Sequence, residues 1–171
     1  RDDVESRGLG DVYKRQGLSA AFNHFIGTHT IVEGASMEST LHDEDSLYVD
    51  KIAYRFGKPK RFDIIVFRYD EDNYYIKRII GLPGETVEIK DGIIYINGNK
   101  LNENYGLENM DELNNTYDAV TIGEDEYYVL GDNRNHSTDS RSKDVGLVKK
   151  SQIIGKASYR IYPFDTFGKL K

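Results

Sequence analysis

Short runs of apolar, β-branched and aromatic residues, separated by polar turns, recur along most of the chain. The clearest run spans residues 74–80 and is followed by the turn formers Gly81, Pro83 and Gly84. The same pattern predicts strands at residues 30–33, 46–54, 63–69, 86–90, 93–96, 119–122, 126–130 and 151–162. Short strands with turn signals roughly every 8–12 residues predict an all-β, mainly antiparallel fold.

Several turns can be assigned a geometry. The dipeptides Asp91-Gly92 and Asn97-Gly98 predict hairpins, because both central positions of a type I′ turn need positive φ. Gly155, inside the last apolar run, predicts a β-bulge. Residues 56–61 form a basic turn. Residues 100–117 are rich in Asn and Glu, and they predict a loop excursion or small subdomain with one short helix at 107–113.

Composition narrows the function classes. The net charge of −6 on 171 residues argues against non-specific nucleic-acid binding, which needs a basic face. The chain has no cysteine, so disulfides, thiol catalysis and cysteine metal sites are excluded. The four histidines lack metal-ligand spacing, so neither a metal nor a cofactor is expected.

The first part of the chain differs from the rest. Residues 1–16 are polar, mixed in charge and without apolar periodicity, so we expect a non-native or disordered tail. Residues 17–27 are modestly apolar and suggest the remnant of an N-terminal membrane helix. No apolar run reaches the length of about 18 residues that a transmembrane helix needs. We expect the β domain to occupy residues 28–171.

A lysine interrupts the clearest strand. If the strand lies at a sheet edge, Lys77 and Arg78 are simply solvated. If Lys77 is buried, its charged form is costly and its pKa falls, and Arg78 as a cationic neighbour would lower it further. A lysine that is neutral near neutral pH can act as a general base.

Two polar stretches offer partners for that lysine. Ser36 follows a predicted strand and small residues, so it is either a turn serine or a nucleophile whose best available base is Lys77. Residues 131–141, GDNRNHSTDSR, form either a solvated loop or a positioning loop after a buried strand. In the second case Asp139 and Arg141 pair, and Ser137 orients the Lys77 amine.

Four motifs together resemble those of type I signal peptidases, which are membrane-bound serine proteases with a Ser-Lys dyad. They are GASMESTL (34–41), RFDIIVF (61–67), YYIKRIIGLPGE (74–85) and GDNRNHSTDSR (131–141), and the resemblance runs from about residue 31 to 163. It implies a signal-peptidase-like catalytic β domain with a small β subdomain inserted at about residues 86–125. Here Ser39 stands where the family has proline, which loosens the turn and adds a second hydroxyl near Ser36.

The resemblance also implies residue roles. Ser36 is the expected nucleophile and Lys77 the general base. Around them we expect an oxyanion and supporting group, with Gly34 standing where some members carry a hydroxyl donor: Gly34, Ser137, Asp132, Asn133, Asp139 and Arg141. Substrate-pocket candidates are the apolar chain neighbours of the dyad: Val32, Met37, Leu41, Tyr75 and Ile76.

The implied activity is removal of N-terminal signal peptides from secreted preproteins through an acyl-enzyme. Expected partners are the signal peptides of preproteins, the membrane surface and the protein-export machinery, and no nucleic acid. The expected location is the cell membrane, with the catalytic domain on the extracytoplasmic side and the anchor missing or damaged in this chain. Two alternatives stay open: a self-cleaving repressor-type protease with a similar dyad, and a catalytically dead β module that binds extended peptides.

Overall fold

The fold is built from two antiparallel sheets. It was determined as a computed structural model, which describes residues 27–108, 110 and 116–171. The strands are β1 (Gly27–Ile31), β2 (Ser46–Asp50), β3 (Ile64–Arg68), β4 (Tyr74–Gly81), β5 (Thr86–Lys90), β6 (Ile93–Ile96), β7 (Asn99–Lys100), β8 (Tyr117–Thr121), β9 (Glu126–Leu130), β10 (Val148–Lys149), β11 (Ile153–Tyr162) and β12 (Gly168–Lys169). Three short 3₁₀ helices join them: η1 (Arg134–His136), η2 (Lys150–Gln152) and η3 (Phe164–Thr166). The predicted all-β, mainly antiparallel fold is confirmed.

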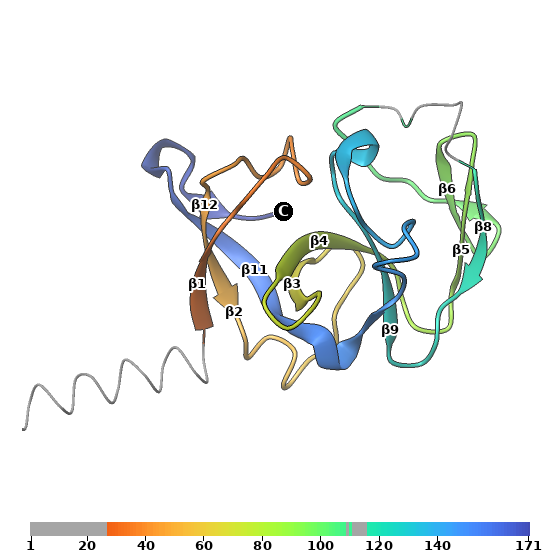
Figure 1. The fold of residues 1–171 in the computed structure, drawn as a ribbon, viewed down its shortest axis with the longest axis horizontal. Helices are drawn as coiled ribbons and strands as arrows, with labels where there is room; N and C mark the ends of the chain where they lie inside the picture. Colours follow the sequence, from red (N-terminus) through yellow and green to blue (C-terminus); the bar gives the residue numbers. More distant parts are fainter. Residues whose placement is uncertain (1–26, 109, 111–115) are drawn as a thin grey trace, which may run out of the picture.

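The larger sheet carries the strands before residue 82 and after residue 125. Its order is β1-β2-β11-β3-β4-β9-β10, with β12 added on β11. The four-stranded sheet has the order β7-β6-β5-β8 and lies beyond β9 (Figure 1). Both Asp-Gly and Asn-Gly turns have the predicted positive φ, at Asp91, Gly92, Asn97 and Gly98. The register of β11 against β3 shifts between Ile153 and Gly155, which confirms the predicted bulge.

Some predicted boundaries differ from the structure. The second predicted strand ends at Asp50 rather than at residue 54, because the Asp50 carboxylate accepts the N–H groups of Ile52 and Ala53 and turns the chain. The tail at 1–16 and most of the predicted membrane-helix remnant at 17–27 lie outside the described residues. The predicted helix at 107–113 also lies largely outside them.

The central strands are buried on both faces, which decides where the site can form. Ile64 to Phe67 of β3 are all buried, and so are Lys77 to Gly81 of β4. Ile64 belongs to an apolar cluster with Val32, Met37, Leu41, Leu47 and Ala157, whereas Ile65 and Phe67 pack with Ile79, Tyr127, Val129 and Val148. Lys77 and Arg78 therefore enter the interior from the middle of a core strand.

Candidate active site

Lys77 lies within hydrogen-bond distance of Ser36. The Lys77 side chain leaves β4, where the residue pairs with Ile65 of β3, and it is only 4% exposed. Its Nζ atom donates to Ser36 Oγ at 2.8 Å and to the Ile76 carbonyl at 3.0 Å. A buried amine beside a serine hydroxyl is the contact that a lysine base needs in order to activate a serine nucleophile.

Burial lowers the pKa of the Lys77 amine. Desolvation lowers the pKa of Lys77 from 10.5 to about 8, and the nearby carboxylates of Asp139 and Asp132 oppose part of that effect. The neutral form that a base needs is therefore far more accessible near neutral pH than it is for an ordinary lysine. The expected contribution of Arg78 is absent, because consecutive strand residues point to opposite faces and Arg78 is paired with Asp132.

The turn after β1 sets the position of Ser36. Gly34 has a φ of +84°, a conformation that disfavours other residues, and its N–H donates to Asp43 Oδ1 at 2.8 Å. That N–H is therefore already engaged and does not face an oxyanion. Asn133 fixes the other side of the turn: its backbone N–H donates to the Ser36 carbonyl at 3.1 Å, and its side-chain amide donates to the Ala35 carbonyl at 3.0 Å.

The 131–141 loop is folded against the core rather than solvated. Asp139 is buried, accepts the Gly131 N–H at 3.0 Å, and pairs with Arg141 through an Nε–Oδ1 distance of 2.8 Å. Ser140 exchanges two hydrogen bonds with Val129 at the end of β9. These contacts hold the loop beside the dyad and keep a carboxylate near the Lys77 amine.

Ser137 sits in the tightest part of this loop. A Cβ atom placed on Gly131 would lie 2.2 Å from Ser137 Oγ and 2.4 Å from the Ser36 carbonyl oxygen, so glycine is required there. The Ser137 hydroxyl is buried and makes no hydrogen bond to a described residue. The expected bond to Lys77 is not formed in this structure, although both side chains border the Ser36 turn.

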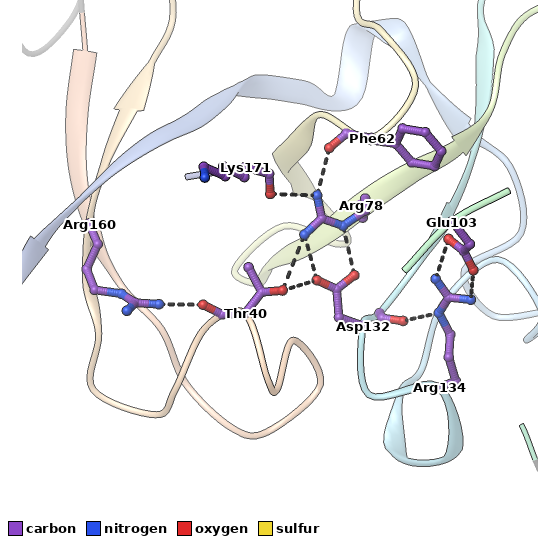
Figure 2. A network of polar contacts seen from close by, with 9 residues as sticks. Thr40, Phe62, Arg78, Glu103, Asp132, Arg134, Arg160 and Lys171 are labelled. Atoms are coloured by element: carbon purple, nitrogen blue, oxygen red, sulfur yellow. Dashed lines mark hydrogen bonds and ion pairs between the residues drawn. The ribbon is translucent and has the colours of Figure 1, made fainter. Parts of the chain in front are cut away.

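A second polar network braces the opposite face of β4, as Figure 2 shows. The buried Arg78 guanidinium contacts both carboxylate oxygens of Asp132, at 2.9 and 2.7 Å. It also donates to the carbonyls of Phe62 and Lys171, each at 2.9 Å. Thr40 Oγ1 donates to Asp132 at 2.5 Å. Since Thr40 follows Ser36 by four residues and Asp132 begins the supporting loop, this network ties both to the strand of Lys77.

A cleft of about 470 Å³ opens beside the dyad. Four pocket candidates line it, namely Val32, Met37, Tyr75 and Ile76, together with Ser36 and Lys77. Leu41 does not: it is fully buried in the apolar cluster below the Ser36 turn. The sequence prediction missed other lining residues, among them Glu33, Asp72, Tyr74, His136 and Thr138. Tyr74, His136 and Thr138 lie within the motifs at 74–85 and 131–141, and Glu33 directly precedes the motif at 34–41, so sequence could have flagged them. Asp72 is brought in by the β3–β4 turn.

Within the described ranges, no group of three or more His, Asp or Glu side chains could hold a metal ion. No helix in that same part of the chain is long and apolar enough to cross a membrane.

Comparison with known proteins assigns the family. The family model for signal peptidase, peptidase S26, matches residues 16–162. Signal peptidase I of Bacillus licheniformis is 40% identical over 160 residues, which cover 89% of this chain and 86% of that protein. Signal peptidase I T of Bacillus subtilis is 37% identical over 162 residues, which cover 90% and 83%. A crystal structure of a signal peptidase I from Enterococcus faecalis matches with a TM-score of 0.49 at 40% identity, covering 58% of this chain and 97% of that one.

The matches extend over most of the sequence, including all four motifs. They favour a signal peptidase over a repressor-type protease. The chain therefore belongs to the signal peptidase family, peptidase S26, and is a serine protease of the type I signal peptidase class that processes signal peptides.

Proposed function

We propose that this enzyme cleaves signal peptides by a Ser36–Lys77 dyad mechanism through an acyl-enzyme. The observation that carries the proposal is the buried Lys77 amine, whose Nζ atom lies 2.8 Å from Ser36 Oγ. Neutral Lys77 removes the Ser36 proton as Oγ attacks the scissile carbonyl carbon. The resulting Lys77 ammonium then protonates the leaving amine, and the mature protein departs.

Hydrolysis of the acyl-enzyme uses the same base. Lys77, again neutral, takes a proton from water as the water oxygen attacks the ester carbon. The Lys77 ammonium then returns that proton to Ser36 Oγ as the bond between the carbon and Oγ breaks. The oxyanion needs preorganised donors. The Ser36 N–H is the first, since it makes no hydrogen bond to a described residue. The Gly34 N–H is bound to Asp43, so the second donor comes from another backbone group or from water.

Substrate binding by strand addition is supported by an open edge. β4 pairs with β3 over Tyr74 to Arg78, but β9 joins its other side only from Arg78 onward. The cleft lies along this uncovered edge, between residues 30–34 and residues 74–77. An extended peptide can take up the unpaired main-chain groups there, with its alternate side chains in the cleft. By resemblance, those side chains are small, and the substrates are preproteins.

The location follows from the substrate. We infer that the catalytic domain works at the extracytoplasmic face of the cell membrane, beside the protein-export machinery, because signal peptides become accessible there. Family membership supports this location.

The test is cleavage of a preprotein with an Ala-x-Ala site in detergent micelles. Ser36→Ala and Lys77→Ala should each lower kcat/KM by roughly 10³-fold or more, with unchanged circular dichroism. Ser39→Ala is the matched control, because it removes a neighbouring hydroxyl from the same turn, and it should retain activity. Substantial cleavage by either dyad variant would refute the mechanism, whereas peptide binding by the unmodified chain without turnover would favour the dead-module alternative.

The pH profile tests Lys77 directly. Because the pKa of Lys77 is lowered to about 8, kcat/KM should rise with pH and level off above that value. Below it, the rate should increase about tenfold per pH unit. A profile that rises only above pH 10 would mean that Lys77 is solvated.

A further inference from the structure

The loop between β2 and β3 carries an unusual concentration of positive charge. Residues 51–61 hold five of the 23 Lys and Arg residues and no Asp or Glu, in a chain whose net charge is −6. Arg61 is paired with Glu85 at 2.6 Å, so Lys51, Arg55, Lys58 and Lys60 make up the basic surface of the loop. The proteolytic mechanism uses none of these side chains. Such a patch on an acidic protein favours an anionic partner.

This loop is anchored at both ends. Asp50 Oδ1 accepts the N–H groups of Ile52 and Ala53 at 2.8 and 3.0 Å. Asp63 Oδ2 accepts the Lys60 N–H and the Tyr54 hydroxyl, both at 3.0 Å. Two carboxylates thus bind the loop from within, so its outward side chains keep a defined arrangement.

One apolar side chain projects from this basic loop. Phe56 is 91% exposed, the highest value among the exposed large hydrophobic residues. Gly57 next to it approaches the Ala53 carbonyl so closely that a Cβ atom would lie 2.8 Å away, which fixes the tight turn that presents Phe56. An exposed aromatic ring among cations suits the boundary between lipid headgroups and acyl chains.

The loop also borders a cavity of about 340 Å³. Its lining includes the cationic residues Lys51, Arg55 and Lys150, apolar groups such as Pro59 and Ile153, and no acidic residue. Lys150 comes from η2, so the cavity joins two distant segments of the chain. Cations around an apolar base match a phosphate group attached to a hydrocarbon.

Strand register places this loop at a defined end of the molecule. Gly27, the first residue of β1, pairs with Asp50, the residue directly before the basic loop. Strand β1 of the larger sheet therefore begins beside Lys51, at the end of the molecule that carries the basic loop.

We propose that residues 51–61, together with Lys150, form a docking surface for an anionic phospholipid bilayer. A lipid phosphate occupies the cavity between Lys51, Arg55 and Lys150, and Phe56 inserts at the headgroup boundary. This proposal rests on the proposed membrane location and adds the surface that binds the bilayer. It does not depend on the Ser36–Lys77 mechanism. Vesicle binding and peptide cleavage therefore test the two proposals separately.

The experiment is flotation of the 171-residue chain with phosphatidylcholine vesicles, with and without phosphatidylglycerol. The triple variant Lys51→Gln/Arg55→Gln/Lys150→Gln should bind the anionic vesicles about a hundredfold more weakly, at about fivefold for each basic residue lost. Phe56→Ser should weaken binding about tenfold. The matched controls are Lys100→Gln/Lys143→Gln/Lys169→Gln and Phe164→Ser, and both should bind like the unmodified chain.

Each outcome decides the proposal. Loss of binding in both loop variants, with cleavage of a soluble peptide and circular dichroism unchanged, supports it. Equal binding by all variants, or equal losses in loop and control variants, overturns it. Weakening by the charge changes alone also overturns it, because purely electrostatic attraction to the vesicle surface would not need Phe56.

Discussion

Lys77 places an ammonium group in a strand whose neighbours are core residues, and this should cost stability. The folded-state pKa of about 8 lies below the ordinary value of 10.5, so the folded protein holds the proton less tightly than the unfolded chain does. The destabilisation is therefore complete below pH 8, decreases as the pH rises toward 10.5, and is absent above it. The proposed mechanism needs this same desolvated amine.

Replacing Lys77 with Met should raise stability while abolishing cleavage. Removing the buried charge should increase the free energy of unfolding at pH 7 by up to about 3 kcal/mol, offset in part by the lost hydrogen bonds. The gain should shrink between pH 8 and 10.5. Urea unfolding at pH 7 and pH 10 measures both effects. The exposed Lys90→Met serves as control, and a gain that does not depend on pH would contradict the assignment.

The Ser137 hydroxyl offers a second test at the residue scale. In this structure it is buried without a hydrogen bond to a described residue, a situation that costs rather than adds stability. Ser137→Ala should therefore leave the melting temperature unchanged or slightly higher. If the hydroxyl turns to Lys77 during catalysis, kcat should fall about tenfold with KM unchanged. Unaltered kcat across the pH profile would assign Ser137 a packing role only.

Elements, rather than single residues, set the geometry of the dyad. β4 supplies Lys77, the turn after β1 supplies Ser36, and the 131–141 loop holds both. The loop and the Ser36 turn meet at Gly131, where a Cβ atom would lie 2.4 Å from the Ser36 carbonyl. A side chain at this junction must displace the nucleophile turn or the loop.

Gly131→Ala should accordingly reduce cleavage by at least about 10²-fold, because catalysis is sensitive to displacements of about 1 Å. Gly168→Ala is the matched control, since nothing lies within 4 Å of a Cβ atom there. Cleavage assays and thermal melts of both variants provide the comparison. Full activity in Gly131→Ala would show that the loop shifts without affecting Ser36.

On the scale of the whole molecule, the four-stranded sheet is connected to the active site by residues 101–108, which follow β7 and contact the 131–141 loop. Arg134 in η1 is bound by Glu103, with Nη–Oε distances of 2.5 and 2.8 Å. Arg134 Nε also donates to the Gly131 carbonyl at 2.9 Å, and Leu107 donates its N–H to the Asp132 carbonyl at 3.0 Å. Residues 101–108 thus brace the loop that supports the dyad, through Leu107 and through Glu103, which Figure 2 shows bound to Arg134.

Glu103→Gln should leave the buried Arg134 guanidinium without a charged partner. Breaking such a pair from one side costs about 3–5 kcal/mol, and the loop should loosen, so both melting temperature and kcat should fall. Glu88→Gln, in the exposed pair with Lys90, should change stability by less than about 1 kcal/mol. Differential scanning calorimetry and cleavage assays test this. A drop in stability with full activity would show that the contact between Glu103 and Arg134 does not affect the positions of Ser36 and Lys77.

Local sequence was sufficient for the strands and turns. Alternation and β-branched residues gave every long strand within a few residues, and the Asp-Gly and Asn-Gly turns followed from the need for positive φ. The four motifs identified the family, and with it the expected roles of Ser36 and Lys77. These signals are readable because they depend on residues that are close in the chain.

The tertiary structure alone decided the burial and partners of the charged side chains. Lys77 and Arg78 are adjacent in sequence and were equally compatible with a solvated edge. Packing of β3, β9 and the 131–141 loop turned the first into an amine of lowered pKa and the second into a braced ion pair. Desolvation depends on neighbours brought close by the fold, such as Ile65 of β3, and the hydrogen-bond partner Ser36 lies 41 positions away from Lys77. The basic loop, too, was visible as charge, but its cavity with Lys150 required the fold.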